Sequence, residues 1–185
     1  MPPLRLASHV RAAQHATVRI LGIDPGLATV GVGLIEATNP HAMTVIDWCA
    51  ITTAAGGSLP DRLAEIHRDL DAFLKEAKPD IAVVEKLYFS RNEQTAFDVA
   101  QARGAILVTI AGHGISVIEP TPMQVKLCVT GSGSADKKQM QAMVTQSLKL
   151  KEIPRPDDAA DALGLAIYGA VTAAVPRREA GVRAA

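Results

Sequence analysis

The sequence predicts an α/β protein with a mixed five-stranded sheet, three antiparallel strands followed by parallel ones, flanked by helices. Three observations lead to this fold class. Three apolar, β-branched runs come first and are separated by short Gly-, Pro- and Asn-containing connections, as in antiparallel hairpins. Helical segments then alternate with two short apolar strands. No internal repeat or low-complexity linker interrupts residues 18–175, so we expect one domain there.

Apolar runs rich in β-branched residues define the expected strands. The first, VRILGID at residues 18–24, is almost continuously apolar and stops at a Pro-Gly pair, as a buried strand does. TVGVGLIEA (29–37) and AMTVIDWCAIT (42–52) follow after short connections, so these three strands should form an antiparallel meander. IAVVE (81–85) and ISVIE (115–119) are shorter, and a helical segment precedes each, which favours parallel pairing.

The segments between and after these strands have the spacing of helices. Residues 60–77 carry large apolar residues on one face, with a proline in the first turn and another after the end. Residues 95–111 lie between the last two strands, and further helices are expected over 121–129, 136–149 and 157–174. The last of these begins with three aspartates in five positions and continues with small and apolar residues, so it should pack on the sheet.

Outside residues 18–175 we expect two flexible tails. The N-terminal tail, residues 1–17, contains two arginines and no acid but lacks the long apolar stretch of a secretory signal. The C-terminal tail is PRREAGVRAA, residues 176–185. No apolar run is long enough for a membrane helix, and Cys49 and Cys128 are isolated, as in a reducing compartment. We therefore expect a cytoplasmic protein without a membrane partner.

The net charge of zero argues at first against a nucleic-acid partner. The basic residues are nevertheless clustered. Between Lys126 and Arg155 there are six Lys or Arg and only two acids, Asp136 and Glu152, and six minus two leaves four positive charges. A basic surface beside an acidic site can hold a polyanion when cations fill that site. This segment is therefore expected to supply such a surface.

Four carboxylates stand at positions that favour one shared site. Asp24 and Glu85 end the first and fourth expected strands, and ligands bind at strand ends in open α/β sheets. Asp158 and Asp161 are three residues apart, so they share one face of the last helix. Asp157 points about 100° away from Asp158 and is a weaker candidate. A helix start favours carboxylates in any case, but one such residue is enough for that purpose.

The chemistry of these four acids points to divalent cations. If the side chains converge, their mutual repulsion raises their pKa values or requires a counter-charge. Oxygen ligands without His or Cys suit Mg²⁺ or Mn²⁺ better than zinc. Two such ions can activate a water molecule and stabilise the leaving oxygen of a phosphodiester. The acids therefore predict a metal-dependent nuclease in which the same four residues are catalytic and metal-binding.

Aromatic residues are scarce in the chain, yet two of them adjoin the fourth strand. Tyr88 and Phe89 follow it in KLYFSRN, residues 86–92. One of them could stack on an unpaired base near the scissile phosphate while Arg91 holds the backbone. The alternative is that one or both anchor the core. We carry all three residues forward as candidate DNA contacts.

A Gly/Ser loop, TGSGSADKKQ at residues 130–139, leads into a helix start. Small residues let the backbone approach a phosphate, the helix start offers N–H groups, and Lys137 and Lys138 add positive charge. The alternative is a plain linker with Ser134 as the helix cap. Lys126, in PMQVK, lies on the preceding helix and could reach the same side. These three lysines complete the candidate DNA contacts.

The stretch GIDPG followed by TVGVG has a second interpretation. In the actin and sugar-kinase ATPases, a D-x-G near the first strand turn approaches nucleotide phosphates, and this stretch alone does not separate the two possibilities. Those ATPases repeat their domain with a second such turn. This chain has neither the second motif nor the length, so we prefer the nuclease.

In this order and spacing, six motifs resemble the RuvC family of Holliday junction resolvases, within the RNase H-like nuclease superfamily. They are ILGIDPG (20–26), VVEKLYF (83–89), AQARGAIL (100–107), PMQVK (122–126), GSADKKQ (133–139) and DAADALGLAI (158–167). The resemblance covers nearly everything from residue 19 to residue 172. It implies an RNase H-like fold, and it departs from the usual family residues at Lys86, often Gln, and Tyr88, often Phe.

The resemblance implies a homodimer that binds a four-way DNA junction in recombination and repair. It would nick two strands of like polarity at symmetric positions, leaving 5′-phosphate and 3′-hydroxyl ends. The family's metal-binding acids map onto the four acids above and imply two Mg²⁺ ions per active site, with Mn²⁺ able to substitute. Its stacking aromatic maps onto Tyr88 and its important lysines onto Lys126 and Lys137. The AQARGAIL helix would contribute to the dimer interface, and the RuvA and RuvB branch-migration proteins would be partners.

Two other functions stay open on sequence alone. A non-catalytic junction-binding module could keep this fold, although it has no physical reason to retain all four acids. An RNase H-like nuclease could instead act on RNA–DNA hybrids. Cleavage of a synthetic junction with Mg²⁺ or Mn²⁺ separates the first from the resolvase, and offering junction and hybrid side by side separates the second.

Overall fold

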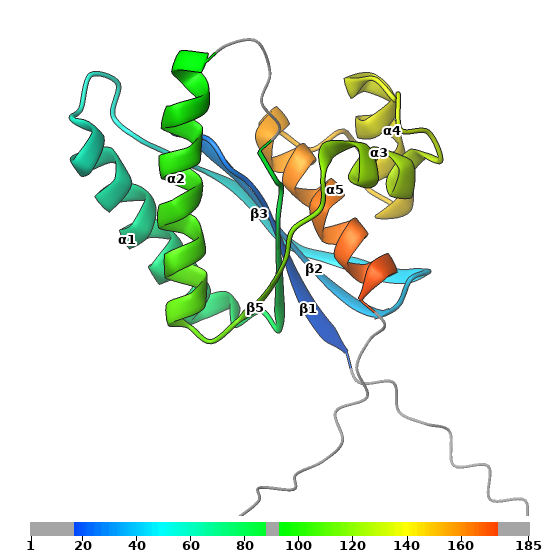
Figure 1. Ribbon diagram of the computed structural model, residues 1–185. Helices are drawn as coiled ribbons and strands as arrows, with labels where there is room; N and C mark the ends of the chain where they lie inside the picture. Colours follow the sequence, from blue (N-terminus) through cyan, green and yellow to red (C-terminus); the bar gives the residue numbers. More distant parts are fainter. Residues whose placement is uncertain (1–16, 88–92, 174–185) are drawn as a thin grey trace, which may run out of the picture.

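The computed structural model describes residues 17–87 and 93–173 (Figure 1). Its strands are β1 (Val18–Asp24), β2 (Thr29–Asn39), β3 (Ala42–Thr52), β4 (Ile81–Val84) and β5 (Ser116–Ile118). Its helices are α1 (Leu59–Ala77), α2 (Glu93–Gly112), α3 (Pro122–Thr130), α4 (Lys137–Ser147) and α5 (Asp157–Thr172). Every expected element is present. The two expected tails, apart from Thr17, lie outside the described residues.

The strands form one five-stranded sheet in the order β3-β2-β1-β4-β5. β2 pairs antiparallel with both β1 and β3, whereas β4 pairs parallel with β1 and β5 parallel with β4. This confirms the predicted mixed sheet. β2 runs two residues beyond the predicted end at residue 37, because Asn39 still pairs with Ala42 across a tight turn.

The parallel pairing of β1 with β4 brings two acids to the same edge of the sheet. Ile23 is level with Val84 in the register. The next residues along the chain are Asp24, the last of β1, and Glu85, just after β4, so the two acids lie side by side at this edge. β1 and β4 both end at the upper side of the sheet in Figure 1.

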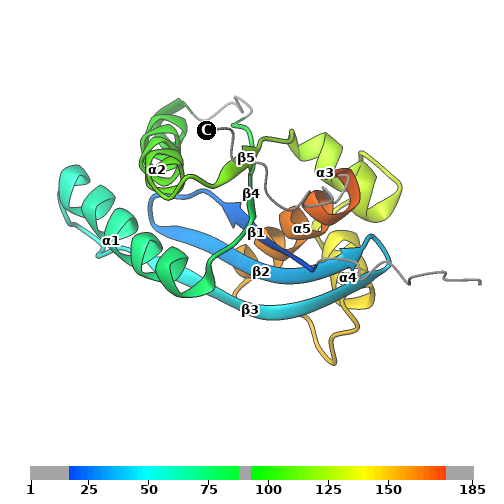
Figure 2. The same ribbon diagram turned by 90° about the horizontal axis from the view of Figure 1, so that it is seen from below.

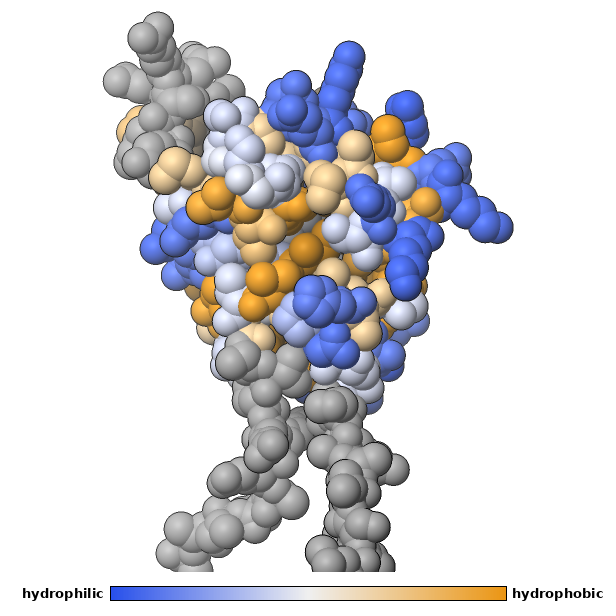
Figure 3. Space-filling view, turned by 90° about the vertical axis from the view of Figure 1, so that its right-hand side faces the viewer, coloured by the Kyte–Doolittle hydropathy of each residue, from blue (hydrophilic) through white to orange (hydrophobic). Residues whose placement is uncertain are grey.

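Helices cover both faces of the sheet in three layers (Figures 1 and 2). α1 and α2 pack on one face against one buried cluster, and α3, α4 and α5 lie on the other face against a second cluster. Alternate strand residues supply the two clusters: Ile20 packs towards α5, whereas Leu21 and Ile23 pack towards α1 and α2. On the face towards α3, α4 and α5, hydrophilic side chains surround a central apolar area (Figure 3).

α5 lies unusually close to the sheet because glycines stand beneath it. A Cβ atom added to Gly22 of β1 would overlap the carbonyl oxygen of Ala162, and one added to Gly31 of β2 would overlap that of Asp158. Ten residues of α5 between Ala159 and Ala170 are buried. The first turn of α5 is thereby fixed over the strand end that carries Asp24, since Gly31 is its partner in the register.

No helix in the described part of the chain combines the length and the apolar character needed to cross a bilayer.

Candidate active site

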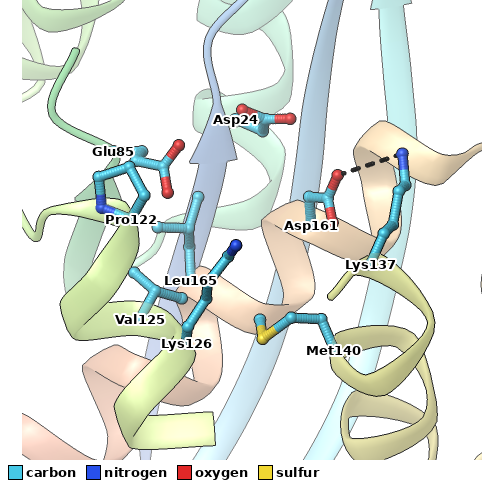
Figure 4. Close-up of a pocket in the computed structure, with 9 residues that line it drawn as sticks. All are labelled: Asp24, Glu85, Pro122, Val125, Lys126, Lys137, Met140, Asp161 and Leu165. Carbon is cyan, nitrogen blue, oxygen red and sulfur yellow. Dashed lines mark ion pairs between the residues drawn. The ribbon is translucent and has the colours of Figure 1, made fainter. Parts of the chain in front are cut away.

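A cleft of about 240 Å³ opens at the edge of the sheet where β1 and β4 end. Residues from five places in the chain line it: Asp24, Glu85, Pro122, Val125, Lys126, Lys137, Met140, Asp161 and Leu165. Figure 4 shows the carboxylates of Asp24, Glu85 and Asp161 around one space, with Lys126 reaching in from α3. The structure therefore brings together three of the four acids singled out from the sequence.

The fourth acid, Asp158, stands at the margin of this group. It does not line the cleft, but it lies directly over Gly31, the residue that pairs with Asp24. Its charge is one of those that raise the pKa of Asp24. Asp158 thus belongs electrostatically to the cluster.

Burial and mutual repulsion perturb the acids strongly. Loss of solvent, together with the charges of Asp161, Glu85 and Asp158, raises the pKa of Asp24 to about 7. Loss of solvent and the charge of Asp161, opposed by Lys126, raise the pKa of Glu85 to about 7 as well. The cluster is therefore short of positive charge. Perturbed carboxylates of this kind gather at functional sites.

Lys137 provides part of that positive charge. Its Nζ lies 3.7 Å from Oδ2 of Asp161 and 3.1 Å from Oδ2 of Asp157 (Figure 4 marks the first pair). Burial raises the pKa of Asp161, and Lys137 opposes that rise. The pKa of Lys137 is itself raised, chiefly by its hydrogen bond to Asp157.

Two capping boxes orient the helices that carry the cleft lysines. The Thr121 hydroxyl accepts a hydrogen bond from the backbone N–H of Gln124 at the start of α3, whose second turn bears Lys126. Asp136 accepts one from Gln139 N–H at the start of α4, of which Lys137 is the first residue. Asp136 therefore caps this helix, not Ser134.

The candidate DNA contacts divide into three groups. Lys126 and Lys137 line the cleft. Lys138 is exposed and does not line it. Tyr88, Phe89 and Arg91 lie outside the described residues, so their expected roles stay predictions.

Sequence reasoning missed Arg103, which connects α2 to the cleft. Its Nε donates a 2.8 Å hydrogen bond to the backbone carbonyl of Glu85. Its guanidinium also pairs with Glu119, just after β5. With its side chain only 15% exposed, Arg103 bridges the ends of two strands and fixes the backbone beside the cleft acid. The available signal was that Arg103 is the sole basic residue of α2.

The acids fit a hard divalent cation in their chemistry, because all four are oxygen donors and the raised pKa values of Asp24, Glu85 and Asp161 indicate unneutralised charge. Within residues 17–87 and 93–173, however, no three Asp, Glu, His or Cys side chains are arranged closely enough to hold one ion. Asp161 is turned towards Lys137 instead. Holding an ion therefore requires small side-chain movements.

Known proteins resemble this chain along most of its length. A family model described as Crossover junction endodeoxyribonuclease RuvC matches residues 20–169. The RuvC of Chloroflexus aurantiacus is 50% identical over 161 residues, which cover 87% of this chain and 98% of that protein. The RuvC of Syntrophomonas wolfei is 50% identical over 150 residues, covering 81% and 87%.

A solved structure of T. thermophilus RuvC in complex with Holliday junction substrate superposes with a TM-score of 0.78 at 33% identity. The superposition covers 83% of this chain and 93% of that chain. The RNase H-like fold and the resemblance inferred from the six motifs are thus confirmed, and this chain belongs to the RuvC family of crossover junction endodeoxyribonucleases.

Proposed function

We propose that this protein resolves four-way DNA junctions in recombination and repair by two symmetric nicks that leave 5′-phosphate and 3′-hydroxyl ends. The observation that carries the proposal is the cleft in which Asp24, Glu85 and Asp161 meet beside two lysines, in a chain of the RuvC family. Because the proposed substrate is chromosomal DNA, we place the enzyme in the cytoplasm.

Asp24, Glu85, Asp158 and Asp161 are proposed to hold two Mg²⁺ ions, for which Mn²⁺ can substitute. Their carboxylates are hard oxygen donors, and the raised pKa values of Asp24 and Glu85 indicate a site that divalent charge would stabilise. When bound, such ions supply an activated water molecule and a stabilised leaving oxygen. The protein contributes two acids at neighbouring strand ends and a first turn of α5 held against β2.

The basic side chains are proposed to hold the DNA backbone. Lys126 and Lys137 stand inside the cleft, where a phosphate placed between the acids would lie within their reach, and Lys138 extends the positive surface along α4. Tyr88 or Phe89 would stack on an unpaired base next to the scissile phosphate, and Arg91 would hold the adjoining strand.

A homodimer is proposed through the exposed face of α2, since a two-fold junction cut twice suits two copies related by a two-fold axis. Phe97 is 68% exposed and Val108 is 73% exposed. Gly104 lies between them with open space above it, so another helix could approach. Val108→Glu should give a monomer in analytical ultracentrifugation and uncouple the two nicks. RuvA and RuvB are the proposed partners in branch migration.

The testing experiment offers the full chain four DNA substrates in parallel: a synthetic four-way junction, its linear duplex arms, a nicked junction and an RNA–DNA hybrid. We expect Mg²⁺-dependent paired nicks on the junction and the second nick on the nicked junction, with no cleavage of the duplex arms or the hybrid and none with EDTA. Asp161→Asn should bind the junction and fail to cut it. Glu152→Gln, which changes an exposed acid outside the cleft, should cut normally. Equal rates on junction and duplex would remove the structure-selective part of the proposal.

The same experiment separates the other two functions. Binding without cleavage, with either metal, would identify a non-catalytic junction-binding module. Faster cleavage of the hybrid than of the junction would identify an RNase H-type enzyme instead.

A further inference from the structure

Asp157 is the one acid of the first turn of α5 with no part in the proposed ion site, yet two side chains of α4 hold it. Its side chain is 55% exposed and does not line the cleft. Lys137 Nζ lies 3.1 Å from its Oδ2, and Gln141 Nε2 donates a 3.2 Å hydrogen bond to its Oδ1. Lys137 and Gln141 are four residues apart, on one face of α4. Each carboxylate oxygen of Asp157 therefore has its own partner.

Lys137 forms ion pairs with two acids and lies closer to one of them. Its ammonium is 3.1 Å from Asp157 and 3.7 Å from Asp161. The closer acid is the one outside the cleft, and the more distant one lines the cleft. The amide of Gln141 fixes the closer acid in place. The ammonium consequently rests at the rim of the cleft, where its ion pair with Asp161 is the longer of the two.

This arrangement matters for any cation that approaches Asp161. A carboxylate oxygen in close contact with an ammonium group is less available as a ligand, because the two cations repel each other at short range. If Asp157 were neutral, the nearest acid to Lys137 would be Asp161. The ammonium would then move onto it and compete with a divalent ion.

We propose that Asp157 is a positioning residue that keeps Lys137 from a closer contact with Asp161, so that a divalent cation can displace the lysine from Asp161 while the lysine remains beside the cleft to meet a DNA phosphate. The inference rests on the proposed ion site. It gives the first aspartate of PDDAAD a role that differs from those of the other two: Asp161 faces the cleft, Asp158 stands at its margin and Asp157 holds the lysine.

The test is a double-mutant cycle read by ion binding, without DNA and without turnover. Mn²⁺ is titrated calorimetrically into the full chain and its Asp157→Asn, Lys137→Ala and double variants, at one pH and low salt. Asn is close to Asp in shape, so the ion pair is lost with little change in packing. Thermal melting in EDTA checks that each variant is folded. Glu152→Gln is the matched control for the loss of one exposed negative charge.

We expect Asp157→Asn to weaken Mn²⁺ binding about two- to fivefold, the range for a partly exposed ion pair. In the Lys137→Ala background the same change should weaken it no more than Glu152→Gln does. Gln141→Ala should give a smaller loss that also depends on Lys137, since it loosens Asp157 without removing its charge.

Two outcomes would overturn the inference. An equal loss in both backgrounds would mean that Asp157 acts only as a distant charge, and no loss beyond that of Glu152→Gln would mean that it has no effect. Failure of the unaltered protein to bind Mn²⁺, or binding that survives Asp161→Asn unchanged, would overturn the ion site itself. These results differ from each other, so the two proposals can fail separately.

Discussion

Replacing Asp24 by asparagine should make the metal-free protein more stable while abolishing cleavage. Burial and three neighbouring acids raise the pKa of Asp24 from 3.8 to about 7. At pH 8 the folded protein must therefore ionise a carboxylate that the unfolded chain ionises easily. That difference corresponds to about 4 kcal/mol of lost stability, at about 1.4 kcal/mol per pH unit. An asparagine side chain at this position would carry no charge and would remove this penalty.

The stability gained by Asp24→Asn should depend on pH. Because the folded pKa lies above the unfolded one, the folded state holds the proton more tightly between about pH 4 and 7, and stability falls as pH rises through that window. At pH 5 the penalty is only about 1.7 kcal/mol, so the advantage of Asp24→Asn should fall by more than half. Divalent ions should stabilise the unaltered protein more than the variant, since the variant lacks one proposed ligand.

The assay is urea denaturation in EDTA at pH 5 and pH 8, repeated at pH 8 with Mg²⁺, and Glu152→Gln serves as the control. The control should change the free energy of unfolding by less than about 0.5 kcal/mol at either pH. A variant no more stable than the unaltered protein at pH 8 would refute the reasoning. A gain that is the same at both pH values would also refute it, because a raised pKa could not then be its cause.

Three further predictions concern how the site is built. Gly31→Ala should lower the free energy of unfolding by about 1–3 kcal/mol in urea and abolish cleavage, because the new methyl group would overlap the backbone oxygen of Asp158; normal activity would contradict this. Arg103→Ala should slow single-turnover cleavage far more than it weakens junction binding, because it releases the backbone of Glu85; equal losses would contradict it. Lys126→Ala should make the plot of log junction affinity against log salt concentration less steep, by about 1 in slope. An unchanged slope would mean that Lys126 does not contact a phosphate.

The elements of the fold could be predicted from the sequence because each follows from local periodicity. The run VRILGID and the apolar face of α1 are visible without knowledge of the partner that buries them. Element ends were less certain where two local signals competed. Ser134 and Asp136 are both good helix caps, and the Gln three residues after Asp136 decides the matter by completing a capping box.

The site could be predicted only in part, because several of its determinants act across the fold. Asp24 and Glu85 were found because strand ends are recognisable in sequence. The contact of Arg103 with the carbonyl of Glu85 could not be found, since nothing local indicates which backbone oxygen a distant guanidinium meets. The sequence also could not show that Lys137 pairs with both Asp157 and Asp161 and lies closer to Asp157. Such contacts depend on how α2 and α4 dock.

The two glycines beneath α5 connect packing with chemistry. Nothing in the sequence alone indicates the role of Gly31, and only the docked helix shows that it gives room to Asp158. That close approach also removes water from the strand end, and loss of solvent is the largest cause of the raised pKa of Asp24. A wider separation would return the acids to solvent and weaken their need for divalent charge. The site therefore requires a helix that is apolar but begins with acids. The small residues between α5 and the sheet allow their close approach, and that approach raises the pKa of Asp24.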